Sequence, residues 1–163
     1  MKTGFLLIGA LVLALHVSFV AEAGAPQSKI AFERGSNVWI ANIDGTKERK
    51  LIKGDDPRIA PDGTKVAFTM TPTGSKDVER YIAVVDVETG ATKIFDIASG
   101  KATRLTPKKS YASDSCWLSD SEILVVDAQK DAKVSSIYRV SISDGASRLV
   151  IKNAFNPSVS GGL

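Results

Sequence analysis

Histidine and cysteine are almost absent from this 163-residue chain. The single histidine, His16, lies in an apolar N-terminal run, and the single cysteine is Cys116. A lone cysteine supplies neither a disulfide framework nor a thiolate zinc site within the chain. Because no histidine follows residue 16, Ser-His-Asp and Cys-His catalysis and histidine metal sites are excluded from the rest of the sequence. The neighbours Ser115, Trp117 and Leu118 favour Cys116 as a small buried hydrophobe.

Helical periodicity is missing after the N-terminal run. No window of about eleven residues keeps apolar side chains at i, i+3, i+4 and i+7, the pattern of an amphipathic helix. The sequence also lacks a glycine-rich phosphate loop ahead of a helix and the Gly-x-Ser-x-Gly phrase of a hydrolase nucleophile. Phosphate binding by such a loop and serine hydrolysis are therefore not predicted.

The charge of the chain is modest and dispersed. Lys and Arg number 21 against 18 Asp and Glu, for a formal net charge of +3. Because there is no basic stripe with interleaved aromatics, no nucleic-acid partner is predicted. Lys108-Lys109 is the only lysine pair, and Tyr111 follows it in a loop between two repeats. Since tyrosine is enriched at binding surfaces, we predict Lys108, Lys109 and Tyr111 as partner-binding residues.

The N-terminal residues have the pattern of an export signal. Met1-Lys2 is positive, the apolar run Phe5–Val20 follows, and Ala21-Glu22-Ala23 has small residues at the spacing that signal peptidase accepts. We predict a signal peptide over residues 1–23 and a flexible lead-in over residues 24–28. An uncleaved anchor is the alternative, but about 16 apolar residues fall short of the roughly 20 that span a bilayer. The rest of the chain is expected to be periplasmic or secreted, without stable membrane insertion.

From residue 29 onward, short β-branched or aromatic runs alternate with turn residues, which predicts an all-β fold. The predicted strands are Lys29–Arg34, Val38–Ile43, Glu48–Ile52, Arg58–Ala60, Lys65–Met70, Arg80–Val87, Glu122–Asp127, Ser136–Ile142 and Ser147–Ile151. Trp39 and Trp117 lie within strand phrases, so both are predicted to be core residues.

One phrase of strands and turns nearly recurs along the chain. Its clearest copy contains the turn Pro61-Asp62-Gly63, the strands Lys65–Phe68 and Tyr81–Asp86, and a final Arg104-Leu105-Thr106. Repeated sheet units that cannot bury their own faces imply a stacked or radial β architecture.

These phrases resemble the WD40-like repeats of TolB-type β-propellers. Weaker copies combine Lys29–Phe32 with Val38–Ile40, and Trp117–Ser121 with Ile137–Val140. The resemblance implies a partial β-propeller of about three four-stranded antiparallel blades, without the separate α/β domain of TolB. The predicted units cover about residues 29–53, 54–106 and 107–152, and a further unit starts over residues 153–163.

About three blades are fewer than the four or more that close a propeller ring. The first unit begins at what looks like its second strand, Ile30–Phe32, whereas Pro157–Ser160 looks like a first strand. One interpretation is a homodimer in which two copies complete a six-bladed ring and each lends its C-terminal strand to the other. The other is a fragment of a longer propeller, because Gly161-Gly162-Leu163 stands where another turn is due.

Aspartates at turns are the remaining candidates for catalysis. They are Asp55, Asp56, Asp62, Asp86, Asp96, Asp114, Asp120, Asp127 and Asp144. An aspartate at such a position commonly accepts hydrogen bonds from nearby backbone amides and fixes the turn. Their spacing nominates no catalytic pair, and there is no alternating calcium loop. We therefore predict no catalytic residue, no metal and no cofactor.

The sequence predicts an exported, non-catalytic β-propeller module that binds a protein partner in the bacterial cell envelope. One alternative is the detached propeller of a secreted enzyme of prolyl-oligopeptidase or dipeptidyl-peptidase type, which the resemblance also allows. Another is a standalone carboxylate-dependent lyase or hydrolase.

Overall fold

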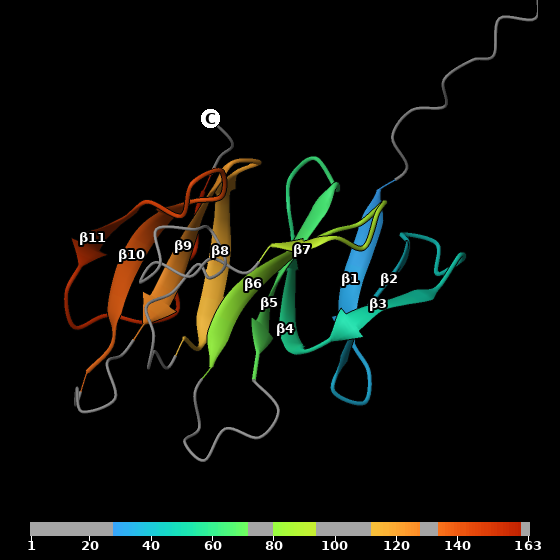
Figure 1. The fold of residues 1–163 in the computed structure, drawn as a ribbon, viewed down its shortest axis with the longest axis horizontal. Coiled ribbons are helices and arrows are strands. Elements are labelled where there is room, and N and C mark those ends of the chain that lie inside the picture. The colour runs from blue at the N-terminus through green and yellow to red at the C-terminus, as the bar shows by residue number, and fades with distance from the viewer. Residues whose placement is uncertain (1–27, 72–79, 94–111, 128–133, 161–163) are drawn as a thin grey trace, which may run out of the picture.

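A computed structural model describes residues 28–71, 80–93, 112–127 and 134–160. In these ranges the chain forms three antiparallel sheets, which lie side by side along the long axis (Figure 1). No helix of this part of the chain is long and apolar enough to cross a membrane. The predicted all-β fold with blade-like sheets is confirmed.

Each sheet is a meander in which strands that follow one another in sequence are neighbours. The first blade contains β1 (Lys29–Glu33), β2 (Asn37–Asn42) and β3 (Arg49–Lys53). The second blade contains β4 (Asp55–Ile59), β5 (Lys65–Met70), β6 (Tyr81–Asp86) and β7 (Thr92–Lys93). The third blade contains β8 (Asp114–Ser119), β9 (Glu122–Asp127), β10 (Ser136–Ser141) and β11 (Ser147–Ile151).

The core lies between the blades, because side chains alternate across each strand. On β6, Ala83 and Val85 join the cluster toward the first blade, and Ile82 and Val84 join the cluster toward the third. The first cluster contains Val38, Ile40, Val66, Phe68, Ala83, Val85 and Val87. The second contains Ala60, Ala67, Ile82, Val84, Ala112, Trp117, Ile123, Val125, Val140 and Ile142. The second blade is therefore buried on both faces, which explains its unbroken apolar run.

The two predicted core tryptophans have different environments. Trp117 is 9% exposed and belongs to the cluster between the second and third blades, as predicted. Its Nε1 donates a hydrogen bond of 2.8 Å to the backbone carbonyl of Arg58. Trp39 is half-buried and belongs to neither cluster, so its predicted core position is wrong. On β2 it alternates with Val38 and Ile40, which face the second blade, and therefore points away from that blade.

Candidate functional site

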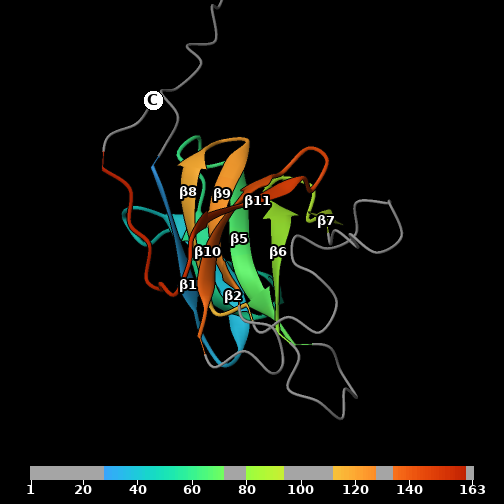
Figure 2. The same ribbon diagram turned by 90° about the vertical axis from the view of Figure 1, so that its left-hand side faces the viewer.

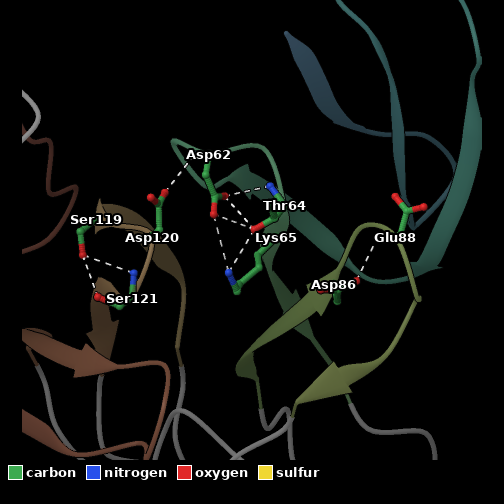
Figure 3. Close-up of polar contacts among 8 residues, drawn as sticks. All are labelled: Asp62, Thr64, Lys65, Asp86, Glu88, Ser119, Asp120 and Ser121. Carbon is green, nitrogen blue, oxygen red and sulfur yellow. Dashed lines mark hydrogen bonds and ion pairs between the residues drawn. The ribbon is translucent and has the colours of Figure 1, made fainter. Parts of the chain in front are cut away.

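The aspartates at the turns accept hydrogen bonds from their own turn residues. Asp62 accepts one from the backbone N–H of Thr64 at 2.8 Å, together with bonds from the Thr64 hydroxyl (Figure 3). Asp86 accepts bonds from the backbone N–H and hydroxyl of Thr89 at 2.8 and 2.9 Å. Asp144 accepts a bond of 3.0 Å from the Ala146 amide. The predicted turn-shaping role of these three aspartates is confirmed.

These hydrogen bonds hold the turn carboxylates in their ionised form. The backbone and hydroxyl bonds from Thr89 lower the pKa of Asp86, and the backbone bond from Ala146 lowers the pKa of Asp144. For Asp62, partial burial alone would raise the pKa, but the bonds from Thr64 and the charge of Lys65 together bring it below its usual value. A general acid that works near neutral pH needs a raised pKa instead, so these carboxylates are poorly suited to that role.

The lowered pKa of Asp86 gives a pH dependence of stability. A carboxyl whose folded pKa is depressed stabilises the fold above its unfolded pKa of about 3.9, and this contribution is lost as the pH falls through the folded value. We expect the thermal unfolding temperature to decrease as the pH is lowered from about 5 to 2.5. Replacing Asp86 by asparagine should lower the unfolding temperature at pH 7 and weaken its acid dependence. An unchanged acid profile in this variant, followed by circular dichroism, would show that the Asp86 charge does not contribute.

Other predicted aspartates contact neighbouring strands or blades. Asp120, at the third-blade turn, accepts a hydrogen bond of 2.9 Å from the backbone N–H of Asp62 in the second blade (Figure 3). Asp114 accepts the Ser115 amide at 2.8 Å and forms an ion pair with Arg58 at 3.5 Å. These two aspartates therefore connect the second and third blades.

The remaining predicted aspartates have separate positions. Asp56 forms an ion pair with Arg80 at 4.0 Å. Asp55 lies half-buried on β4, and Asp127 is buried at the end of β9. Asp96 is outside the described residues. Across the described ranges, no three His, Cys, Asp or Glu side chains come together in a geometry that could hold a metal ion.

A groove of about 990 Å³ runs along the innermost strands of the blades. Its walls come from β1, β4 and β8 and from residues 156–159. In Figure 2, β1 and β8 lie on the same side of the molecule. Apolar Ala31, Ile59 and Val159 contribute to these walls, and the Arg58–Asp114 ion pair supplies charges of both signs. The Arg58 side chain is 49% exposed and the Asp114 side chain 22% exposed. We call this feature the axial groove.

An aromatic and cationic cluster covers the face of the first blade that points away from the second. The rings of Phe32 and Trp39 are stacked with their centroids 6.5 Å apart. The Arg34 guanidinium lies over both rings, 5.0 and 5.1 Å from their centroids, and also binds the Glu48 carboxylate through two hydrogen bonds of 2.8 and 2.9 Å. We call these four residues the flank cluster of the first blade.

The predicted binding residues Lys108, Lys109 and Tyr111 lie outside the described residues, as does the predicted signal peptide over 1–23. Sequence reasoning did not predict the axial groove, although the Pro-Asp-Gly turn phrase already marked one end of β4. Cys116, predicted to be buried, is half-buried on β8 with a free thiol that also lines the groove. The Cys116 side chain is therefore more exposed to solvent than the predicted buried position implies.

No family model matches the chain. It is 30% identical over 110 residues to Tricorn protease homolog 1 of Streptomyces coelicolor, which covers 64% of this chain and 9% of that protein. It is 28% identical over 123 residues to a putative Tricorn-like protease N-terminal subunit of Sulfurisphaera tokodaii, covering 71% of this chain and 57% of that protein. The chain thus spans less than two thirds of the length of either relative.

Two solved structures are also similar to the chain. The acylaminoacyl peptidase of Pyrococcus horikoshii aligns with a TM-score of 0.53 and 17% identity, over 77% of this chain and 22% of the peptidase. TolB of Acinetobacter baumannii aligns with a TM-score of 0.35 and 18% identity, over 80% of this chain and 42% of TolB. The similar parts of the peptidase and Tricorn-like proteins are β-propeller domains. The chain is a partial β-propeller, as its repeated phrases predict.

Proposed function

We propose that this chain is a non-catalytic β-propeller module that binds an extended polypeptide in the axial groove. The observation that carries the proposal is the groove itself, because its walls combine apolar side chains with an accessible ion pair along three neighbouring strands. Concave sites that combine apolar side chains with placed polar groups are typical of ligand binding. A polypeptide offers both apolar side chains and charged or main-chain groups to such walls.

The turn aspartates support a role without catalysis. Asp62, Asp86 and Asp144 direct their carboxylates to amides and hydroxyls of their own turns. A carboxylate engaged in this way stabilises the backbone and has less capacity to accept a proton from a substrate. The absence of histidine after residue 16 removes the commonest general base from the same surface.

Two further observations each favour a candidate partner. The N-terminal export pattern favours a partner in the bacterial envelope or outside the cell. Similarity to Tricorn-like proteins and to an acylaminoacyl peptidase favours a second candidate, in which the module accompanies a peptidase and presents peptides to it. In both cases the module contributes binding and another polypeptide contributes any hydrolysis.

A peptide-binding assay tests this function. We expect extended peptides to change the fluorescence of Trp117, which lines the groove, and to remain uncleaved after prolonged incubation. Arg58→Ala should weaken binding about tenfold, because it removes a charged hydrogen-bond donor from the wall. Arg148→Ala is the matched control, because Arg148 is exposed on β11 and does not line the groove.

Two outcomes would contradict the proposal. Cleavage that disappears after substitution of a turn aspartate would establish catalysis by the chain itself. Equal peptide affinity of the Arg58 and Arg148 variants would place binding elsewhere. Identification of a captured envelope protein as a hydrolase or as a non-hydrolase would separate the two partner candidates.

A further inference from the structure

Residues 154–160 begin in the same way as the two segments that lead from one blade to the next. The Gly54 amide donates a hydrogen bond of 3.2 Å to the Ser36 carbonyl, just before β2. The Ala112 amide donates one of 3.2 Å to the carbonyl of Arg80, just before β6. The Ala154 amide makes the corresponding bond of 3.0 Å to the Ser135 carbonyl, just before β10. The chain therefore leaves the third blade with the same geometry by which it leaves the first and second.

The backbone after this bond matches the start of β4 closely. Asp56 and Asn156 both have a positive φ, 51° and 52°, and each directly precedes a proline. The sequences that follow, Pro57-Arg58-Ile59 and Pro157-Ser158-Val159, have the same pattern of polar and apolar residues. Like β4, residues 156–159 line the axial groove. Residues 154–160 thus occupy the place of a first strand, and no strand pairs with them in the described part of the chain.

The first blade, in contrast, lacks a first strand. The pairing of β1 with β2 follows the pairing of β5 with β6 residue for residue: Phe32 lies opposite Trp39 as Phe68 lies opposite Ala83. β1 is therefore a second strand by register as well as by sequence. In the second blade, β4 pairs with the other edge of β5. Among the described residues, β1 has no such neighbour, so its outer edge presents unpaired amides and carbonyls.

Residues 156–159 do not occupy this free edge within the chain. They line the same groove as Lys29 and Ala31 of β1 but are not hydrogen-bonded to that strand. Figure 1 shows β1 and the third blade separated by the second blade. The edge and the strand that would fit it are therefore on opposite sides of the axial groove.

The flank of the first blade also indicates a missing neighbour. By the shared register, Ile30, Phe32 and Trp39 correspond to Val66, Phe68 and Ala83. Those three residues of the second blade are 0% exposed because they pack against the first blade. Ile30, Phe32 and Trp39 are only half-buried. A further blade against this flank would bury them as the first blade buries their counterparts.

The flank of the third blade offers a complementary surface. By the same register, Leu124 and Arg139 correspond to Ala67 and Val84, which face the following blade. Leu124 is half-buried, and Arg139 binds the Glu122 carboxylate through its Nε at 2.6 Å. The apolar Leu124 suits the half-buried Phe32–Trp39 stack. Arg139 is paired with Glu122, just as Arg34, which already lies over both rings, is paired with Glu48.

We propose that two copies of this chain exchange residues 154–160, so that this segment of each copy pairs as a first strand with β1 of the other. The third blade of each copy then packs on the flank cluster of its partner's first blade, and two sets of three blades form a closed six-bladed ring. Such a ring lies within the range of about four to eight blades found in propellers. The axial groove of one copy becomes half of a channel that the second copy completes.

The register of the exchanged strand follows from the second blade. There, Arg58 lies opposite Ala67 and Ile59 lies opposite Val66. The equivalent pairs are Ser158 with Ala31 and Val159 with Ile30 of the second copy. Opposing residues in an antiparallel pair have Cα atoms about 4.5–5.5 Å apart, which is within the range that a disulfide bridges.

Sizing and cysteine cross-linking test the exchange directly. We expect the purified wild-type chain to elute with the mass of two chains. In a Cys116→Ser background, we expect oxidation of a mixture of Ser158→Cys and Ala31→Cys chains to give a covalent dimer. Ser158→Cys mixed with Lys29→Cys is the control, because a shift of two residues places the Cα atoms beyond the roughly 7 Å limit of a disulfide.

A surface variant provides an independent measurement. Leu124→Glu places a charge on the flank that the partner covers, and should convert the dimer to a folded monomer. Leu149→Glu is the matched control, because Leu149 lies opposite Tyr138 on the other face of the third blade. A folded wild-type monomer, an open series of higher oligomers, or equal cross-linking by the shifted pair would each overturn the exchange. If the wild-type chain is a folded monomer that binds peptides, the exchange is wrong but the proposed function stands.

Discussion

Replacing Gly54 by alanine is expected to lower the free energy of unfolding by about 3 kcal/mol, the upper part of the range for overpacked sites. A Cβ atom at this position would overlap Cδ2 of Phe68 and lie 2.8 Å from the backbone oxygen of Thr69. The Phe68 side chain is 0% exposed in the cluster between the first two blades, so its ring has little room to move. The backbone of β5 would have to shift. Packing would then be lost around Gly54, where the chain passes from the first blade to the second.

Gly63→Ala is the matched control for Gly54→Ala. Gly63 has a φ of +70°, but no atom lies within 4 Å of a Cβ built there. Its replacement should cost only the backbone strain of a left-handed residue, about 1 kcal/mol. Urea unfolding followed by circular dichroism compares the two variants. If the two variants lose the same free energy of unfolding, Phe68 accommodates the added methyl group, and close packing around Gly54 does not determine the stability.

Replacing Trp117 by alanine is expected to cost about 3–5 kcal/mol, the usual loss for a large buried aromatic side chain. Trp117 packs between the second and third blades, and its indole N–H donates to the Arg58 carbonyl in the second blade. This loss is a large part of the total, since a typical domain is stable by only about 5–15 kcal/mol. The same urea titration measures it.

Two conservative variants separate the parts of the Trp117 contribution. Trp117→Phe keeps an aromatic ring but removes the hydrogen bond to Arg58, and should cost about 1–3 kcal/mol. Trp39→Phe also removes an indole hydrogen bond, of 3.3 Å to the Arg34 carbonyl, but that bond is exposed and the ring is half-buried within its own chain, so the substitution should cost less. A Trp39 variant that loses more stability than the Trp117 variant would contradict this division between core and flank.

Most strands of the blades could be predicted from the sequence, because the residues that favour an extended backbone are also the residues that the sheets bury. In β5 and β9, β-branched and apolar residues lie between turns, and both strands are central in their sheets. The strand β8 was not predicted, because its sequence Asp114–Ser119 begins with an aspartate, which is depleted in strands, and contains no β-branched residue. Its pairing with β9 and the packing of Trp117 determine its conformation instead.

The candidate site was less accessible to sequence reasoning. The turn role of Asp62 and Asp86 depends on residues only two or three positions away, so a local pattern predicts it. The axial groove and the contact between Asp62 and Asp120 join segments far apart in the chain. The misplacement of Trp39 has a similar cause, because strand alternation separates two faces without saying which one a neighbouring blade covers.

The radial order of strands within each blade implies a gradient of local opening. Tyr81 to Val85 of β6 are buried in an unbroken row, whereas all five residues of the outermost strand β11 are exposed. Amide protons on β11 are then released by fraying of a single strand, and those of β6 only when the whole domain unfolds. Hydrogen–deuterium exchange thus distinguishes the interior strands of a sheet from its edge strands, whatever their position in the sequence.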